Sequence, residues 1–163
     1  MENREIKIHY EIYKSTEELN NQDKILIERA IEAAHNAYAP YSGFNVGAAI
    51  LLDNGKIVIG NNQENAAYPS GLCAERVAMF AASSLYPEAI MESIAITAFS
   101  DKFVVDFPIT PCGSCRQVMS EYETRQKKSM KVILKGAKGE IQVINKIADL
   151  LPFMFNADDL KQK

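Results

Sequence analysis

The sequence predicts an α/β sandwich in which helices cover a single mixed sheet. Segments with strand and helix patterns alternate along the chain, which is typical of this architecture. The turn signal "DNG" at residues 53–55, between two apolar runs, places antiparallel strands in the sheet and makes it mixed. With 163 residues, 47% of them hydrophobic, the chain can build an ordinary globular core, and we expect one domain over residues 1–163.

The first elements follow in order up to residue 60. Residues 6–13, "IKIHYEIY", alternate roughly between apolar and polar types and fit a short strand. Apolar residues then recur at helical spacing, which predicts a helix over residues 23–38 with Asp23 as its cap and Pro40 as its stop. The runs "FNVGAAILL" and "KIVIG" flank the turn and form a hairpin over residues 44–60.

Two further helices are predicted to begin beside cysteines. A polar loop at residues 61–71, "NNQENAAYPSG", precedes an alanine-rich helical pattern over residues 73–83. Residues 92–99, "ESIAITAF", fit a buried strand. The next helix begins near Cys112, because Pro111 can precede or open a helix but cannot stand inside one.

The last elements are two strands, "MKVILK" and "EIQVI", joined by a turn that contains glycine, and a short helical piece at "IADLLP". The pattern gives a core over residues 23–160. An N-terminal extension over residues 1–22 precedes it. We expect this extension to form either an extra edge strand or a contact between subunits.

Charge and hydropathy exclude several classes of protein. The formal net charge is -3 with acids and bases mixed along the chain, so no basic patch points to a nucleic-acid partner. No apolar run approaches the roughly 20 residues of a membrane span. The first residues, "MENREIKIHYEIYKSTEEL", are charged and lack the apolar core of a signal peptide, so we expect a soluble cytoplasmic protein without a membrane partner.

The three cysteines carry the strongest functional signal. Cys112 and Cys115 share one side of a first helical turn, and Cys73 opens the other helix. Helix N-termini favour thiolates over thiols. If the two helices begin side by side, three thiolates converge on a zinc ion and leave its fourth position for water, as in catalytic zinc sites.

Glu75 stands two residues after Cys73, in "LCAER". Zinc lowers the pKa of a bound water to about 7, and a nearby carboxylate can accept its proton. Because positions two apart diverge on a helix, Glu75 reaches that water only if Cys73 lies at the very start of the helix. A ligand two residues before a glutamate, followed by Pro-Cys-x-x-Cys, matches the layout of zinc nucleobase deaminases.

Other interpretations stay open from the residues alone. Cys112 and Cys115 could be the redox pair of a thiol oxidoreductase, which would work without metal and without Glu75. A zinc site that only stabilises the fold would need a fourth protein ligand, and the sequence has no obvious one. A polynucleotide editor would need a basic or aromatic stacking track, which the chain lacks.

Over residues 24–160 the chain resembles the small cytidine deaminases that bind zinc through three cysteines. The resemblance rests on "YAPYSGFNVGAAIL", "NNQENAAYPSGLCAER", "PCGSCRQVMSE" and "LLPFMFNADDL", in the family's order and spacing. It implies a three-layer α/β/α sandwich around one mixed five-stranded sheet and one Zn²⁺ per chain. It also implies a homotetramer whose active sites are shared between subunits.

The resemblance also implies roles for individual residues. Cys73, Cys112 and Cys115 would bind zinc, and Glu75 would carry protons. The substrate-binding residues would be Phe44 for the base, Asn62 and Glu64 for the ribose 3′-hydroxyl, the backbone around Ala74 for the pyrimidine, and Ala66, Tyr68 and Phe155 for a neighbouring subunit's site. Three thiolates outweigh the charge of one Zn²⁺, and Arg76 would offset the excess by hydrogen bonding to them. Ser114 and Gln63 depart from the residues commoner in the family.

The predicted reaction is hydrolytic deamination of the small-molecule nucleosides cytidine and 2′-deoxycytidine to the uridines, with release of ammonia, in pyrimidine salvage. The alternative is a deaminase of another cytosine-bearing small molecule such as blasticidin S, whose enzyme shares the zinc motifs. The ending "LLPFMFNADDL" favours the nucleoside enzyme.

Overall fold

The computed structural model describes residues 1–156 and Leu160. These residues form a six-stranded sheet with the strand order β1-β6-β5-β4-β2-β3. The strands are β1 (Glu11–Tyr13), β2 (Phe44–Leu52), β3 (Ile57–Asn61), β4 (Met91–Ser100), β5 (Lys131–Lys135) and β6 (Ile141–Ile144). Strands β4 and β5 run parallel and the other neighbouring pairs run antiparallel, so the sheet is mixed as predicted.

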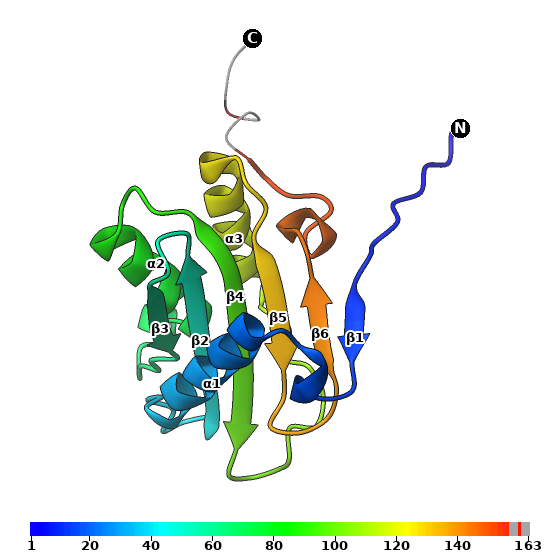
Figure 1. Cartoon of the computed structure of the whole chain (residues 1–163). Coiled ribbons are helices and arrows are strands. Elements are labelled where there is room, and N and C mark those ends of the chain that lie inside the picture. Colours follow the sequence, from blue (N-terminus) through cyan, green and yellow to red (C-terminus); the bar gives the residue numbers. More distant parts are fainter. Residues whose placement is uncertain (157–159, 161–163) are drawn as a thin grey trace.

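Helices cover both faces of the sheet and give the three layers that the resemblance implies (Figure 1). Helix α1 (Asn21–His35) lies on one face, and α2 (Ala74–Leu85) and α3 (Gly113–Gln126) lie on the other. Single 3-10 turns are η1 (Thr16–Glu18), η2 (Tyr68–Ser70) and η3 (Ile147–Asp149). Among the described residues, every helix is too short or too polar to span a lipid bilayer.

Strand β2 shows why several strands of this chain have apolar residues at consecutive positions. Successive side chains of a strand point to opposite faces of the sheet. Ala48 and Ile50 join the core under α2 and α3, whereas Ala49 and Leu51 join the core under α1. Because helices cover both faces, no solvent-facing position interrupts the apolar run.

Three details of the sequence prediction need correction. Helix α1 ends at His35 with Asn36 as its C-cap, so Pro40 is not its stop. The sheet has six strands rather than five, because the N-terminal extension contributes β1, which pairs antiparallel with β6. Asp23 is not the cap of α1. The cap is Asn20, whose Oδ1 accepts a hydrogen bond from the Asp23 N–H at 2.9 Å. Asp23 lies in the first turn, where both carboxylate oxygens accept hydrogen bonds from Lys131 Nζ at 2.6 and 2.8 Å.

Gly60 allows the start of α2 to pack closely against the sheet. At Gly60 in β3, an added Cβ would lie 2.4 Å from the nitrogen of Ala78 and 2.7 Å from the carbonyl oxygen of Ala74. Any side chain there would push α2 away from the sheet. Gly60 therefore helps to fix the position of the helix whose first turn carries Glu75 and whose cap is Cys73.

Candidate active site

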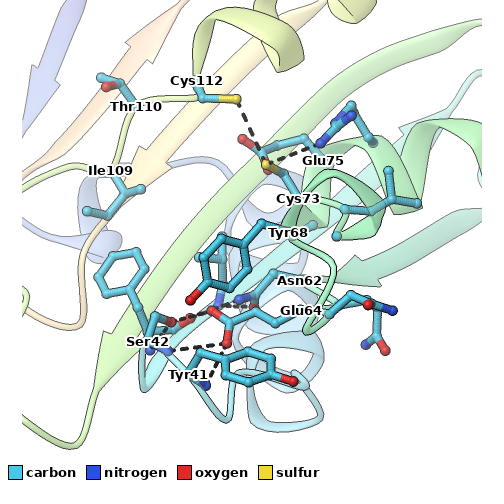
Figure 2. Close-up of a pocket in the computed structure, with 18 residues that line it drawn as sticks. Tyr41, Ser42, Asn62, Glu64, Tyr68, Cys73, Glu75, Ile109, Thr110 and Cys112 are labelled. Carbon is cyan, nitrogen blue, oxygen red and sulfur yellow. Dashed lines mark hydrogen bonds between the residues drawn. The ribbon is translucent and has the colours of Figure 1, made fainter.

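The three cysteines predicted as metal ligands meet where α2 and α3 begin. Cys73 is the N-cap residue of α2, Cys112 is the N-cap residue of α3, and Cys115 follows in the first turn of α3. The Sγ atoms of Cys73 and Cys112 are 3.9 Å apart (Figure 2), and those of Cys112 and Cys115 are 3.5 Å apart. All three sulfurs lie within 4.8 Å of one another, and in the described chain they are the one such group of His, Cys, Asp or Glu placed to hold a metal ion.

The spacing of these sulfurs fits a tetrahedral zinc ion. With Zn–S bonds near 2.3 Å, two sulfurs on a tetrahedron stand about 3.8 Å apart, which is close to the separations of 3.9 and 3.5 Å. A disulfide would bring two sulfurs to about 2 Å, and all three cysteines are free thiols. The cluster therefore offers three corners of a tetrahedron and leaves the fourth to a ligand from outside the protein.

The charges around the cluster favour a thiolate at Cys73. The pKa of Cys73 is lowered to about 5, chiefly by a hydrogen bond with the Cys115 thiol and further by Arg76 and Cys112. The same contact with Cys73, together with burial, raises the pKa of Cys115. Arg76 Nη2 lies 3.8 Å from Cys73 Sγ, and the buried Arg76 Nε has no hydrogen-bond partner among the described residues. Arg76 thus places its positive charge beside the cysteines.

Glu75 lies next to the cysteine cluster (Figure 2). Cys73 has extended backbone angles, with φ -72° and ψ 152°, and α2 begins at the next residue, so Cys73 stands just before the helix. This placement meets the geometric condition under which Glu75 can act at the metal. Glu75 is only 4% exposed, and burial raises the pKa of its carboxyl group.

A pocket of about 750 Å³ opens beside the cysteines and Glu75. Its volume lies within the range typical of small-molecule sites. Its walls come from the loop before β2, the loop between β3 and α2, the first turn of α2 and the loop before α3 (Figure 2). Five of the predicted substrate-binding residues line it, namely Phe44, Asn62, Glu64, Tyr68 and Ala74.

Asn62 also binds the first residues of β2, and Glu64 binds the loop that precedes β2. Asn62 Oδ1 accepts a hydrogen bond from the Val46 N–H at 2.8 Å, and Nδ2 donates to the Phe44 carbonyl at 2.9 Å. The Glu64 carboxylate accepts from the Ser42 N–H at 3.2 Å and from the Ser42 hydroxyl. This hydroxyl is the main cause that lowers the pKa of Glu64. Both side chains therefore shape the wall that carries Phe44.

Three residues in or behind this wall escaped prediction from the sequence. Ser42 lines the pocket, and Lys102 and Phe103 support it from outside. Lys102 Nζ donates a hydrogen bond to the Ser42 carbonyl at 2.6 Å. The Phe103 ring stacks on Phe44, with ring centroids 6.1 Å apart and planes inclined by 19°. Lys102 and Ser42 are 60 positions apart in the sequence, so no local pattern indicates that the two loops support each other.

Three residues were expected to complete a neighbouring subunit's site. Ala66 and Phe155 are exposed, and neither lines the pocket of its own chain. The Phe155 carbonyl accepts a hydrogen bond from Gln117 Nε2 at 2.6 Å, which ties this segment to α3. The third residue, Tyr68, lines the pocket of its own chain (Figure 2).

The cysteine motifs lie within a segment that matches a known protein family. Residues 20–131 match the family model described as the cytidine and deoxycytidylate deaminase zinc-binding region. The chain belongs to this deaminase family. It is therefore a hydrolytic enzyme of the cytidine deaminase type. The family match contains Glu75 and all three cysteines.

Known cytidine deaminases are similar to most of this chain. The cytidine deaminase of Halalkalibacterium halodurans is 42% identical over 137 residues, which cover 84% of this chain and 96% of the relative. That of Sporosarcina psychrophila is 41% identical over 135 residues, which cover 83% of this chain and 92% of the relative. The crystal structure of the cytidine deaminase from Burkholderia pseudomallei superposes with a TM-score of 0.70 at 39% identity, covering 84% of this chain and 100% of that one.

Proposed function

We propose that this deaminase converts cytidine and 2′-deoxycytidine to the uridines by zinc-dependent hydrolysis, with release of ammonia, in pyrimidine salvage. The observation that carries the proposal is a cluster of three thiols, two of which line a pocket of about 750 Å³ together with the buried carboxyl group of Glu75. Similarity to cytidine deaminases over more than four fifths of the chain supports it.

In this proposal Cys73, Cys112 and Cys115 hold one zinc ion per chain, and Arg76 offsets part of the negative charge of the thiolates. When bound, zinc acts as a Lewis acid that makes water a good nucleophile at neutral pH. Thiol ligands must stay reduced, which fits the cytoplasm.

Glu75 carries the protons of the reaction. Its carboxylate takes a proton from the attacking water and gives it to ring N3, which makes C4 electrophilic. The water oxygen then bonds to C4, and Glu75 moves the proton of the added hydroxyl to the amino group. The C4–N bond breaks, ammonia leaves, and the oxygen remains on C4 as the carbonyl of uridine.

The rest of the pocket binds the nucleoside. Phe44 packs against the base. Asn62 and Glu64 bind the ribose 3′-hydroxyl through the hydrogen-bonding capacity that their contacts to β2 and to the loop before it leave free. The backbone around Ala74 binds the pyrimidine, because the first N–H groups of a helix have no acceptor inside it.

A panel of three substrates tests this proposal. The purified enzyme is incubated with cytidine, 2′-deoxycytidine and blasticidin S, and ammonia and product are measured together. We expect equal amounts of ammonia and uridine from cytidine, and the corresponding result from 2′-deoxycytidine. Turnover of blasticidin S alone would support the alternative substrate instead and would refute the assignment of a nucleoside.

Phe103 is predicted to support substrate binding through Phe44. In Phe103→Ala the Phe44 ring loses a stacking partner, and such aromatic pairs contribute about 0.5–1.5 kcal/mol. We expect the KM for cytidine to rise about 2- to 10-fold, with kcat within about twofold of the unmodified enzyme. Steady-state kinetics check this, with Val104→Ala as the control because Val104 is a neighbour of similar exposure. An unchanged KM in Phe103→Ala would show that the stacking has no role in binding.

The enzyme is proposed to be a homotetramer in which Phe155 contacts a neighbouring subunit's site. Phe155 is 58% exposed and lies outside its own pocket. Dilution to monomers is then expected to abolish turnover, and Phe155→Ala to lower kcat/KM about tenfold or more, as loss of a buried aromatic contact does. Phe153→Ala, at an exposed aromatic two residues earlier, is the control. Full activity of the monomer would contradict the shared site.

A further inference from the structure

The N-terminal segment gives the sheet an open edge. Strand β1 is the outermost strand, and β6 pairs with its inner side. Residues 1–10 continue from β1 without helix or turn and run away from the body of the protein (Figure 1). Within the described chain, no strand pairs with the outer side of β1, so its backbone N–H and C=O groups are a template for another strand.

When residues 6–10 continue β1 (Glu11–Tyr13) as an extended strand, the segment has an apolar face and a charged face. Side chains alternate along extended chain, so Lys7, His9 and Glu11 share one face. Glu11 lies opposite Val143, a residue of the core under α1, which fixes this face on the α1 side of the sheet. The other face carries large apolar side chains that are each 45–55% exposed, namely Ile6, Ile8, Tyr10 and Ile12. Exposed edges usually avoid such a row because it promotes association.

We propose that the outer edge of β1 pairs with the same edge of a second copy of this chain, antiparallel, around a two-fold axis at His9. In this register Lys7 of each copy lies opposite Glu11 of the other, which gives two ion pairs. Ile6 then faces Ile12, and Ile8 faces Tyr10, so all four apolar side chains of each copy are matched. The segment is thus complementary to itself in both charge and hydrophobicity.

Shifted registers lose this complementarity. If one copy is shifted along the other so that Glu5 lies opposite Glu11, like charges face each other. Like charges directly opposite each other in a strand pair are destabilising. A shift in the other direction leaves Lys7 opposite Tyr13 and removes both ion pairs. A shift of the register by one residue places apolar side chains opposite charged ones, for example Ile6 opposite Glu11. The register centred on His9 is therefore the preferred one.

The interface is separate from the catalytic site. The family match begins at residue 20, so β1 and the residues before it lie outside the matched region. None of them lines the pocket. The pairing therefore neither depends on the proposed reaction nor replaces the proposed tetramer, and it adds a contact between one assembly and another.

A charge-reversal experiment tests the pairing. In Lys7→Glu, the glutamate introduced at position 7 meets Glu11 of the partner, and in Glu11→Lys two lysines meet. Each variant alone is expected to associate at least about tenfold more weakly than the unmodified protein, as measured by sedimentation velocity over a range of concentrations. When the two variants are mixed in equal amounts and allowed to exchange, opposite charges face each other again at both positions, and association is expected to recover to within about threefold.

Two controls keep the test decisive. Lys56→Glu changes an exposed lysine in the β2–β3 turn and is expected to leave association unchanged. Deletion of residues 1–10 keeps β1 and is expected to reduce the number of chains per assembly as the single variants do. The proposal is overturned if the unmodified protein and the deletion variant have the same number of chains per assembly at all concentrations. It is also overturned if the mixture of the two charge variants associates no better than either one alone.

Discussion

Turnover of cytidine is expected to fall about 10³- to 10⁴-fold in Glu75→Gln, because a positioned acid–base group contributes up to about 10⁴-fold. Glutamine keeps the size and polarity of the side chain in a site where Glu75 is 4% exposed. It cannot take a proton from water or give one to N3 of the base. The loss is expected in kcat, with zinc content and thermal midpoint close to those of the unmodified enzyme.

The control for this variant is Glu88→Gln, which removes a carboxylate from an exposed position outside the pocket. It is expected to retain full activity. Zinc content is measured on both variants by atomic emission, so that loss of metal is distinguished from loss of proton transfer. If Glu75→Gln retained more than about a tenth of the kcat with zinc bound, another group would have to carry the protons.

The second large effect is expected on zinc binding in Cys115→Ser. Cys115 is fully buried at the first turn of α3, so no other side chain can take its place. Changing outer-shell partners of a metal ligand already lowers metal affinity about 10- to 100-fold, and loss of a ligand is expected to lower it further. We expect at least a tenfold fall in zinc per chain after dialysis, with a matching loss of turnover.

Ser114→Ala is the matched control, because Ser114 lies directly before Cys115 and is exposed. It is expected to keep zinc and activity. Thermal unfolding gives an independent readout, since a metal that binds only the folded state stabilises it by mass action. A chelator is expected to lower the midpoint of the unmodified enzyme and of Ser114→Ala, but not that of Cys115→Ser. An unaltered zinc content in Cys115→Ser would remove this cysteine from the ligand set.

The features that the sequence predicts well are those encoded by short spacings. The apolar run of β2, the turn after it and the two helix starts at Cys73 and Cys112 each depend on a few adjacent residues, and the structure confirms them. The convergence of the three cysteines was predicted on the condition that the two helices begin side by side, and the structure meets this condition.

The features that escaped prediction depend on distant partners. The stacking of Phe103 on Phe44 and the contact between Lys102 and Ser42 arise only when two loops are brought together by the pairing of β2 with β4. The sixth strand was left open because residues 11–13 form a strand only by pairing with β6, more than a hundred positions later. The cap of α1 was misplaced by three residues, since Asn20 and Asp23 are both good capping types.

Zinc-dependent deamination of cytidine is tested most directly by two measurements on one purified sample, namely zinc per chain and the conversion of cytidine to uridine with release of ammonia. We expect about one zinc per chain, turnover that is lost when zinc is removed by a chelator, and turnover that returns when zinc is restored. Full turnover in protein freed of metal, or zinc-loaded protein that deaminates no cytosine nucleoside, would contradict this expectation.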